Sequence, residues 1–383
     1  MMNNKHRSRR RQFLTGIGAG AVATLSGCLS RLFQFTGPES DDVDLRWETE
    51  LEGDIRVPPI LSDNFVYVTA RDDYRHGYFY AIERDSGDVR WRSRIDTSTP
   101  LRWVLVEKMA YVAGITTIWA FDLDTQGLAW ENDNVESVYS PVFLDDHVYV
   151  SERDGGVVVL DQASGDVIET IDVPQATRSA IIPYEESYIL ATADPPEHSA
   201  ERHDSGHVRR LDAATFEQEW AQEVSPTPRV TLAPDGEQVV VGGDMDAVTA
   251  LDPADGTEQW ATPIGPDLTR PTLDEDTAYV GAMDGTLYAL DLERGHERWT
   301  FDEPGGLLSF DDAYSSRAPL VVADERVYAP STDENLYVLD RSDGTLRWQF
   351  RAGESLYQPP AIDDGAVFLA GTDGTVYAID HAR

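Results

Sequence analysis

Residues 278–299 read AYVGAMDGTLYALDLERGHERW, two short apolar and aromatic segments separated by Asp284-Gly285 and followed by a tryptophan. Asp-Gly between two such segments is typical of a tight β-hairpin turn. A glycine and a tryptophan, Gly295 and Trp299, stand four and eight residues after Asp291. The stretch therefore predicts antiparallel strands joined by tight turns, with a large aromatic ring at a defined place in the last strand.

The Tyr-Ala-Leu-Asp element of this stretch recurs eight times, with variation, along the chain. Its final acids are separated by 39, 39, 51, 40, 39, 49 and 40 residues; they are Glu83, Asp122, Asp161, Asp212, Asp252, Asp291, Asp340 and Asp380. Tryptophan stands eight residues after the acid in six copies, and Trp47 precedes the first copy. The third copy has Glu169 in place of the tryptophan, and the eighth copy ends before that position. A period near 40 residues with two longer intervals indicates one unit repeated eight times, with two insertions.

Four short strands in about 40 residues match the blade of a β-propeller. The sequence therefore predicts an all-β fold, an eight-bladed β-propeller of four-stranded antiparallel blades. The last blade lacks a fourth strand after Asp380, so we expect residues 43–49 to supply it, with Trp47 as the missing tryptophan. The alternative is a seven-bladed ring with a loose last copy.

The repeat resembles the PQQ-type propeller repeat, which occurs in quinoprotein dehydrogenases and in the outer-membrane assembly lipoprotein BamB. The resemblance covers residues 44–380 and departs from the pattern in copies three and four. It implies that the tryptophans dock between neighbouring blades; they are Trp47, Trp91, Trp130, Trp220, Trp260, Trp299 and Trp348. Quinoprotein dehydrogenases of this kind use a vicinal cysteine pair and calcium-binding carboxylates, whereas this chain has one cysteine. We therefore expect no enzymatic activity and no cofactor.

The N-terminal segment before Glu39 contains no acidic residue and predicts a targeting signal. Arg10, Arg11, Phe13 and Leu14 form the R-R-x-F-L pattern of a twin-arginine export signal. The apolar stretch that follows is too short to span a membrane, which needs roughly 20 residues. An ordinary basic head, read by another export route, is the alternative.

The segment Leu25-Ser-Gly-Cys28 resembles a lipobox, in which cleavage before the cysteine exposes a thiol for lipid attachment. Cys28 is the only cysteine, so it has no intramolecular disulfide partner. We expect residues 1–27 to be a signal peptide, 28–42 a lipidated flexible linker and 43–383 the propeller. The alternative for Cys28 is an incidental thiol.

The chain is strongly acidic, with 69 acids against 31 bases and a net charge of −38, and Lys5 and Lys108 are its only lysines. Such a charge disfavours nucleic-acid binding, because phosphate backbones are repelled. Acid excess with few lysines is typical of extreme halophiles; at molar salt the Debye length is only about 3 Å, which screens the self-repulsion. An acidic mesophilic protein is the alternative.

Six arginines recur near the start of the first strand of their copies: Arg56, Arg102, Arg178, Arg229, Arg270 and Arg317. By sequence offset, Arg102 and Arg270 fall two positions later than the others. Because the first strand of a propeller blade lies closest to the axis, these side chains are expected to ring one mouth of the central channel. Guanidinium groups there suit bidentate capture of an anion or of an acidic segment of a partner. The alternative is that each arginine pairs with a carboxylate of a neighbouring blade.

Three histidines, His198, His203 and His207, lie with Asp204 in and beside the insertion of copy four. Imidazole and carboxylate together suit zinc or copper. The surrounding composition of Pro, Ser, Gly and acids is that of a solvated loop, so we expect no metal there.

These features predict a non-enzymatic, lipid-anchored extracytoplasmic propeller. It would act as a monomeric scaffold for protein partners, held at the outer face of the cell membrane through the lipid on Cys28. The alternative function is a redox enzyme or sensor that binds PQQ or a related quinone over the central channel. The repeat alone supports either function.

Overall fold

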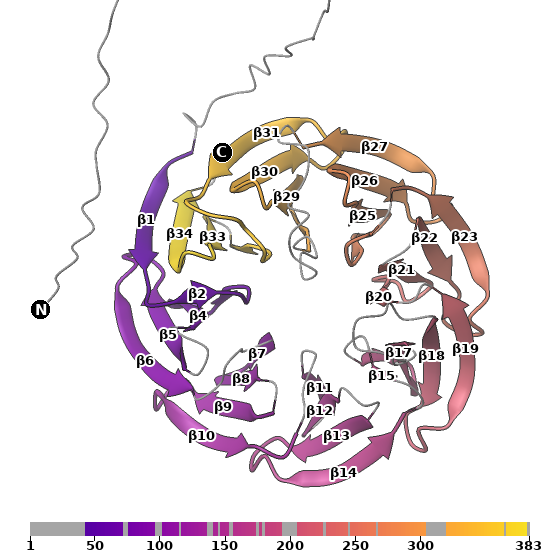
Figure 1. Cartoon of the computed structure of the whole chain (residues 1–383), viewed down its shortest axis with the longest axis horizontal. Helices are drawn as coiled ribbons and strands as arrows, with labels where there is room; N and C mark the ends of the chain where they lie inside the picture. The colour runs from indigo at the N-terminus through magenta and orange to yellow at the C-terminus, as the bar shows by residue number, and fades with distance from the viewer. Residues whose placement is uncertain are drawn as a thin grey trace, which may run out of the picture. The chain divides into compact units, whose positions relative to one another are not determined.

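The computed structural model describes residues 43–71, 76–95, 102–114, 116–135, 141–144, 146–152, 156–173, 176–177, 181–193, 205–224, 227–243, 246–265, 267–303, 319–363 and 365–380. These residues form eight antiparallel blades arranged in a ring around a central axis (Figure 1). The predicted eight-bladed β-propeller is therefore confirmed. Among the described residues, no helix is long and apolar enough to cross a membrane.

The strands of each blade run from the axis outward in chain order. Blade 1 contains β2 (Asp54–Ile55), β3 (Ile60–Leu61), β4 (Phe65–Arg71), β5 (Gly77–Glu83) and β6 (Val89–Ile95). Blade 2 contains β7 (Arg102–Val106), β8 (Met109–Ala113), β9 (Ile118–Asp122) and β10 (Gly127–Asn132), and blade 3 contains β11 (Val142–Leu144), β12 (His147–Ser151), β13 (Gly156–Asp161) and β14 (Val167–Asp172). Blade 4 contains β15 (Ala176–Thr177), β16 (Ile182–Tyr184), β17 (Ser187–Ala193), β18 (Gly206–Asp212) and β19 (Gln218–Val224).

Blades 5 to 8 repeat the order. Blade 5 contains β20 (Pro228–Leu232), β21 (Val239–Gly243), β22 (Ala247–Leu251) and β23 (Glu258–Pro263), and blade 6 contains β24 (Thr272–Leu273), β25 (Thr277–Gly281), β26 (Thr286–Asp291) and β27 (Glu297–Asp302). Blade 7 contains β28 (Val321–Ala323), β29 (Arg326–Pro330), β30 (Asn335–Asp340) and β31 (Leu346–Arg351). Blade 8 contains β32 (Ala361–Ile362), β33 (Ala366–Ala370) and β34 (Thr375–Asp380), and its outer strand is β1 (Leu45–Glu50), the one exception to chain order among the described strands.

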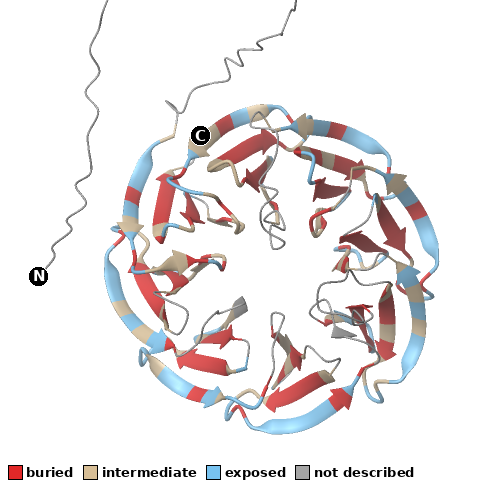
Figure 2. Cartoon of the chain, in the orientation of Figure 1, coloured by how far each residue is buried: buried red, intermediate tan, exposed pale blue. Residues whose placement is uncertain are grey.

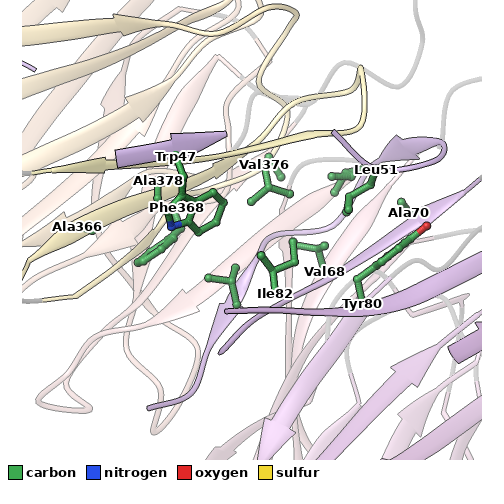
Figure 3. Close-up of a cluster of buried hydrophobic side chains, with 13 residues drawn as sticks. Trp47, Leu51, Val68, Ala70, Tyr80, Ile82, Ala366, Phe368, Val376 and Ala378 are labelled. Carbon is green, nitrogen blue, oxygen red and sulfur yellow. The ribbon is translucent and has the colours of Figure 1, made fainter. Parts of the chain in front are cut away.

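The N-terminal strand β1 closes the ring. It pairs antiparallel with β34, from Leu45 opposite Ile379 to Glu50 opposite Thr375, and so becomes the outer strand of blade 8. The predicted closure is therefore confirmed, and the seven-bladed alternative is excluded. Figure 3 shows the apolar cluster at this junction, where Trp47 and Phe368 of blade 8 lie beside Ile82 of blade 1. Closure of this kind removes an unpaired sheet edge from the eighth blade.

Burial changes sharply between the inner and outer strands. The second and third strands of each blade are almost wholly buried, whereas the fourth strands expose most of their side chains (Figure 2). The tryptophans are the exception on the outer strands, with Trp47, Trp260 and Trp348 at most 8% exposed. The repeat tryptophan is therefore the main contribution of the outer strand to the core.

Each of five tryptophans packs on a turn glycine of the next blade. A Cβ added to Gly87 would come within 2.8 Å of the Trp47 ring, and one added to Gly295 within 2.4 Å of the Trp260 ring. Trp130, Trp220 and Trp299 make the same contact with Gly165, Gly256 and Gly344. The indole Nε1–H donates to a backbone carbonyl of the same turn, for example from Trp260 to Leu292 at 2.9 Å. The repeated glycine is thus required by the ring of the preceding blade.

The same glycine also has a backbone conformation that favours glycine. Its φ is +76° at Gly87 and +72° at Gly295, in the left-handed region. The turn is capped by the repeat acid: in the turn that contains Gly165, Asp161 Oδ1 accepts the N–H groups of Ser164 at 2.8 Å and of Ala163 at 3.1 Å. The hydrogen bonds from Ser164, helped by that from Ala163, hold the pKa of Asp161 below its ordinary value. The acid and glycine of the repeat are therefore explained by one turn.

The interface between blades 3 and 4 departs from this arrangement. Glu169 replaces the tryptophan of blade 3 and is exposed, while Phe216 replaces the turn glycine of blade 4 at φ +55°. The Phe216 ring stacks on Tyr188, with ring centroids 5.4 Å apart, and packs on a cluster that includes Val157 and Val159 of blade 3. An aromatic ring therefore still joins the two blades, but blade 4 supplies it instead of blade 3.

We predict that Phe216→Ala lowers the free energy of unfolding by about 2 kcal/mol, less than the cost at a fully buried phenylalanine because the ring is partly exposed. Glu169→Trp alone should also destabilise, since its ring would meet Phe216. The double variant Glu169→Trp with Phe216→Gly restores the pair of the other interfaces and should recover stability close to the starting protein. Chemical unfolding in molar KCl, analysed as a double-mutant cycle, measures the coupling. Independent, additive effects of the two changes would contradict this account of the interface.

Candidate functional site at the channel mouth

The antiparallel strands give the ring two different faces. The turns between first and second strands and between third and fourth strands lie at one face, here called the turn face. The turns between second and third strands and the connections between blades lie at the other, here called the connection face. Each first strand starts at the connection face and is the innermost strand of its blade (Figure 1).

The described arginines at the starts of the first strands occupy equivalent positions in the residue pairing between first and second strands. This shared position is here called the inner rung. Arg102 pairs with Ala113 and Arg229 pairs with Gly242, and each partner lies near the end of the second strand of its blade. Arg56 follows Ile55, which pairs with Ala70, and so continues to the same rung.

Arg270 reaches this rung as well, because it lies two residues before Thr272, which pairs with Tyr279. The sequence offset that placed Arg102 and Arg270 two positions later was wrong as a guide to register. The two extra residues lie in different places in the two blades. In blade 1 they lie within the first strand, where Ile55 pairs with Ala70 but Ile60 pairs with Tyr67, and in blade 5 they lengthen the β20–β21 turn.

Arg56 is bound within its own blade. Its Nε donates to Asp54 Oδ2 at 2.9 Å, and Arg71 donates to the same oxygen at 2.6 Å. Burial raises the pKa of Asp54, but the hydrogen bonds from Arg56 and Arg71 outweigh it and leave this pKa below its ordinary value. The Arg56 side chain nevertheless stays 58% exposed, so one carboxylate shared by two arginines leaves much of its guanidinium facing solvent.

Arg229 links two blades. Its Nη1 donates to the carbonyl of Leu268 in blade 6 at 2.6 Å, and Thr231 on the same strand donates to the carbonyl of Pro271 at 2.8 Å. Arg270 lies between these two acceptors in the chain. The rung therefore holds Arg229 and Arg270 close to one blade interface. Arg178 and Arg317, and the side chain of Arg102, lie outside what the structure describes.

The turn face is dense in carboxylates. Every turn between a first and a second strand carries one: Asp63, Glu107, Asp146, Glu185, Asp235, Asp274, Asp324 and Asp363. The repeat acids that cap the turns between third and fourth strands add a second ring of carboxylates at this face. The arginines of the inner rung lie at the opposite end of the channel, where the turns between second and third strands also carry carboxylates, among them Asp284, Asp333 and Asp373. A mouth lined by guanidinium groups can bind carboxylate or phosphate.

The histidines are not assembled into a metal site within the described part of the chain. His207 lies in β18, opposite Thr192 and Glu223 of the flanking strands, and its buried Nδ1 has no hydrogen-bond partner there. His198 and His203 lie outside the described residues, as do Cys28 and the export residues Arg10, Arg11, Phe13 and Leu14. No group of three or more His, Cys, Asp or Glu side chains among the residues described is placed to hold a metal.

Sequence reasoning missed two parts of the site. One is Asp54, the shared acceptor of Arg56 and Arg71, although its position two residues before Arg56 was a usable signal. The other is the backbone carbonyl of Leu268, which no side-chain pattern could indicate. Both contacts depend on register and on the neighbouring blade.

Two curated relatives match parts of the chain. Outer membrane protein assembly factor BamB of Burkholderia pseudomallei (strain K96243) is 29% identical over 98 residues, covering 25% of this chain and 26% of that protein. Serine/threonine-protein kinase AfsK of Streptomyces coelicolor is 25% identical over 314 residues, covering 77% of this chain and 35% of the kinase. The matches thus span about a quarter to a third of the length of these relatives.

Solved structures share the fold at low sequence identity. The designed protein Ika8 aligns with a TM-score of 0.70 at 16% identity, over 87% of this chain and 98% of that one. BamB from Moraxella catarrhalis gives 0.66 at 13%, over 88% and 100%. The quinohemoprotein alcohol dehydrogenase ADHIIG from Pseudomonas putida HK5 gives 0.65 at 12%, over 88% and 76%. At these identities the likeness shows the fold alone.

A family model described as outer membrane protein assembly factor BamB matches residues 34–113, 75–169, 204–321 and 311–383. These segments contain the β1 strand that closes the ring and most of every blade except blade 4, whose strands β15, β16 and β17 fall in the gap between residues 169 and 204. Since the match includes most of the chain, this protein belongs to the family described as outer membrane protein assembly factor BamB.

Proposed function

We propose that this chain is a non-enzymatic, lipid-anchored scaffold at the outer face of the cell membrane that binds protein partners. The observation that carries the proposal is that β1 is both the first described strand and an integral strand of blade 8. The residues that follow the expected lipidated linker are therefore part of the closed ring. A linker of residues 28–42 spans at most about 50 Å when fully extended, which would keep the propeller close to the membrane surface.

The connection face is the proposed partner surface. It carries the inner-rung arginines around the channel mouth, in a chain whose net charge is −38. An acidic segment of a partner would find guanidinium groups there and would be repelled by the carboxylates of the turn face. The name of the Burkholderia relative, an assembly factor, is consistent with a role that depends on protein partners. Export by the twin-arginine route and adaptation to molar salt are part of the same proposal.

A quinone-dependent redox function is the second candidate, because the fold recurs in a quinohemoprotein alcohol dehydrogenase. The vicinal cysteine pair expected of such enzymes is not present, since Cys28 is the only cysteine and precedes the ring. The residues present therefore do not fit PQQ in the manner of those enzymes.

We predict that PQQ with Ca²⁺ leaves the melting temperature unchanged at micromolar concentration in molar KCl. A ligand that binds the native state must raise stability by mass action, by about 2.7 kcal/mol at one hundred times its Kd. Differential scanning calorimetry with and without PQQ measures the shift. A saturable increase in melting temperature would favour the redox function over a scaffold alone.

The membrane anchor generates a second prediction. Cys28→Ala should release the exported protein into the medium, because the thiol for lipid attachment is lost. Arg10→Lys with Arg11→Lys should retain precursor inside the cell, and Ser26→Ala is the matched control that should change neither result. Immunoblotting of washed membranes, cytoplasm and medium measures the distribution. A Cys28 variant that stays with washed membranes would disprove anchoring through this residue.

The channel mouth generates a third prediction. Arg56→Gln, Arg229→Gln and Arg270→Gln together should reduce recovery of the partner about tenfold or more, because hydrogen bonds to charged groups contribute about 1.5–3 kcal/mol each. The ring should still form, since the tryptophan contacts are unchanged. Cross-linking in intact cells followed by mass spectrometry measures partner recovery.

The matched control for this variant replaces Arg90, Arg92 and Arg94 by glutamine, which makes the same charge change on the outer strand β6. Equal loss of partner from both variants would show that total charge, and not the channel mouth, is responsible.

A further inference from the structure

A groove of about 670 Å³ opens between blades 4 and 5 at the turn face. One wall is the β16–β17 turn with Tyr184 and Glu185, and the other is the β20–β21 turn with Pro234 and Glu237. The β22–β23 turn, with Pro253, lines it as well. The volume lies within the range of about 300–1,000 Å³ that is typical of ligand sites.

The groove exists because the β20–β21 turn is long. It comprises residues 233–238, whereas residues 107–108 alone join β7 to β8. Hydrogen bonds from the Ala233 N–H to the Gln238 carbonyl, at 2.8 Å, and from the Gly236 N–H to the Ala233 carbonyl, at 2.9 Å, hold it in a defined shape. A Cβ at Gly236 would lie 3.8 Å from the Tyr184 ring. The wall is therefore an ordered part of blade 5.

The lining combines ring surfaces with negative charge. Pro183, Tyr184, Pro234 and Pro253 supply flat apolar surfaces, and the carboxylates that line the groove are Glu185, Asp235, Glu237 and Asp252. Burial, and then the charges of Glu185 and Asp252, raise the pKa of Tyr184. No salt bridge among the described residues uses Asp235, Glu237 or Asp252. The open side of the groove is therefore electrostatically suited to a cation.

The inner side of the groove already shows how this surface holds a guanidinium group. The Cζ of Arg210 lies 5.0 Å from the centroid of the Tyr184 ring. Arg210 Nε lies 2.6 Å from Glu219 Oε2, and its Nη1 donates to the Pro253 carbonyl at 3.2 Å. Arg210 Nη2 also lies 3.8 Å from Glu185 Oε2, so Glu219 and Glu185 both compensate the charge of Arg210. The carboxylates of Asp235 and Glu237 remain available to a second cation.

We propose that this groove binds an extended segment of a partner protein through its arginine side chains. The aliphatic part of an arginine would pack on the prolines and Tyr184, and its guanidinium would bind Asp235 and Glu237. The proposal goes beyond the scaffold function above, because it concerns the opposite face and uses none of the channel-mouth arginines. Together, the two faces would let one ring hold partners of opposite charge.

The test measures binding of a fluorescein-labelled tetra-arginine peptide by anisotropy in 1 M KCl, with tetra-lysine and tetra-citrulline peptides as comparisons. Asp235→Asn with Glu237→Gln should weaken tetra-arginine binding about fivefold, as expected for loss of two partly exposed ion pairs. Tyr184→Phe should bind tetra-arginine like the starting protein, because phenylalanine keeps the aromatic ring. Tyr184→Ala should bind it more weakly, because alanine lacks that ring.

The matched control is Glu275→Gln with Glu293→Gln, which removes the same charge from exposed positions of blade 6 on the same face. It should leave binding within about twofold of the starting value. Equal weakening by both double variants, or tetra-citrulline binding as tightly as tetra-arginine, would overturn the proposal. These outcomes leave the channel-mouth proposal unaffected, since its arginines are intact in every variant.

Discussion

An indole ring packed on a bare turn of the next blade is the contact on which the rest of this structure depends. The ring can lie flat on the turn only where the turn has no side chain, and the turn itself needs a left-handed residue at that place. Glycine satisfies both conditions. The acid four residues earlier caps the same turn through backbone N–H groups. One local arrangement therefore explains three of the most regular positions of the repeat, and it joins neighbouring blades at five described interfaces.

The same arrangement also decides where part of the charge lies. Because the capping acid ends the third strand, every copy places a carboxylate at the turn face for structural reasons. The turns between first and second strands add more carboxylates there. The start of the first strand lies at the opposite face, where the chain places arginine at several blades, beside the carboxylates of the turns between second and third strands. The two faces therefore differ in the arginines that the first strands bring to the channel mouth.

Two departures from the repeat lie at neighbouring interfaces. At the interface between blades 3 and 4, Glu169 stands at the tryptophan position of blade 3, and Phe216 of blade 4 supplies the aromatic ring instead. At the next interface, the long turn of blade 5 creates the groove beside Tyr184, while the Trp220–Gly256 contact is kept. Regularity is thus maintained where a ring joins two blades and relaxed in the turns that face solvent. A binding surface can be built in those turns without weakening the ring.

The sequence by itself determined the number of blades, the strands of each blade and the role of β1, because these follow from spacing within about 40 residues. Trp47 before the first copy, and a last copy without its fourth strand, were sufficient to predict closure. Only the tertiary structure decided which groups meet across blades. The rung shared by Arg102 and Arg229 depends on the lengths of hairpins, and the contact of Arg229 with Leu268 depends on a backbone carbonyl of another blade. The packing of Phe216 on blade 3 compensates for a tryptophan missing from that blade, and no pattern within a single copy carries that information. Local spacing encodes turns and strands, whereas contacts between blades arise only when separate copies are brought together in the closed ring.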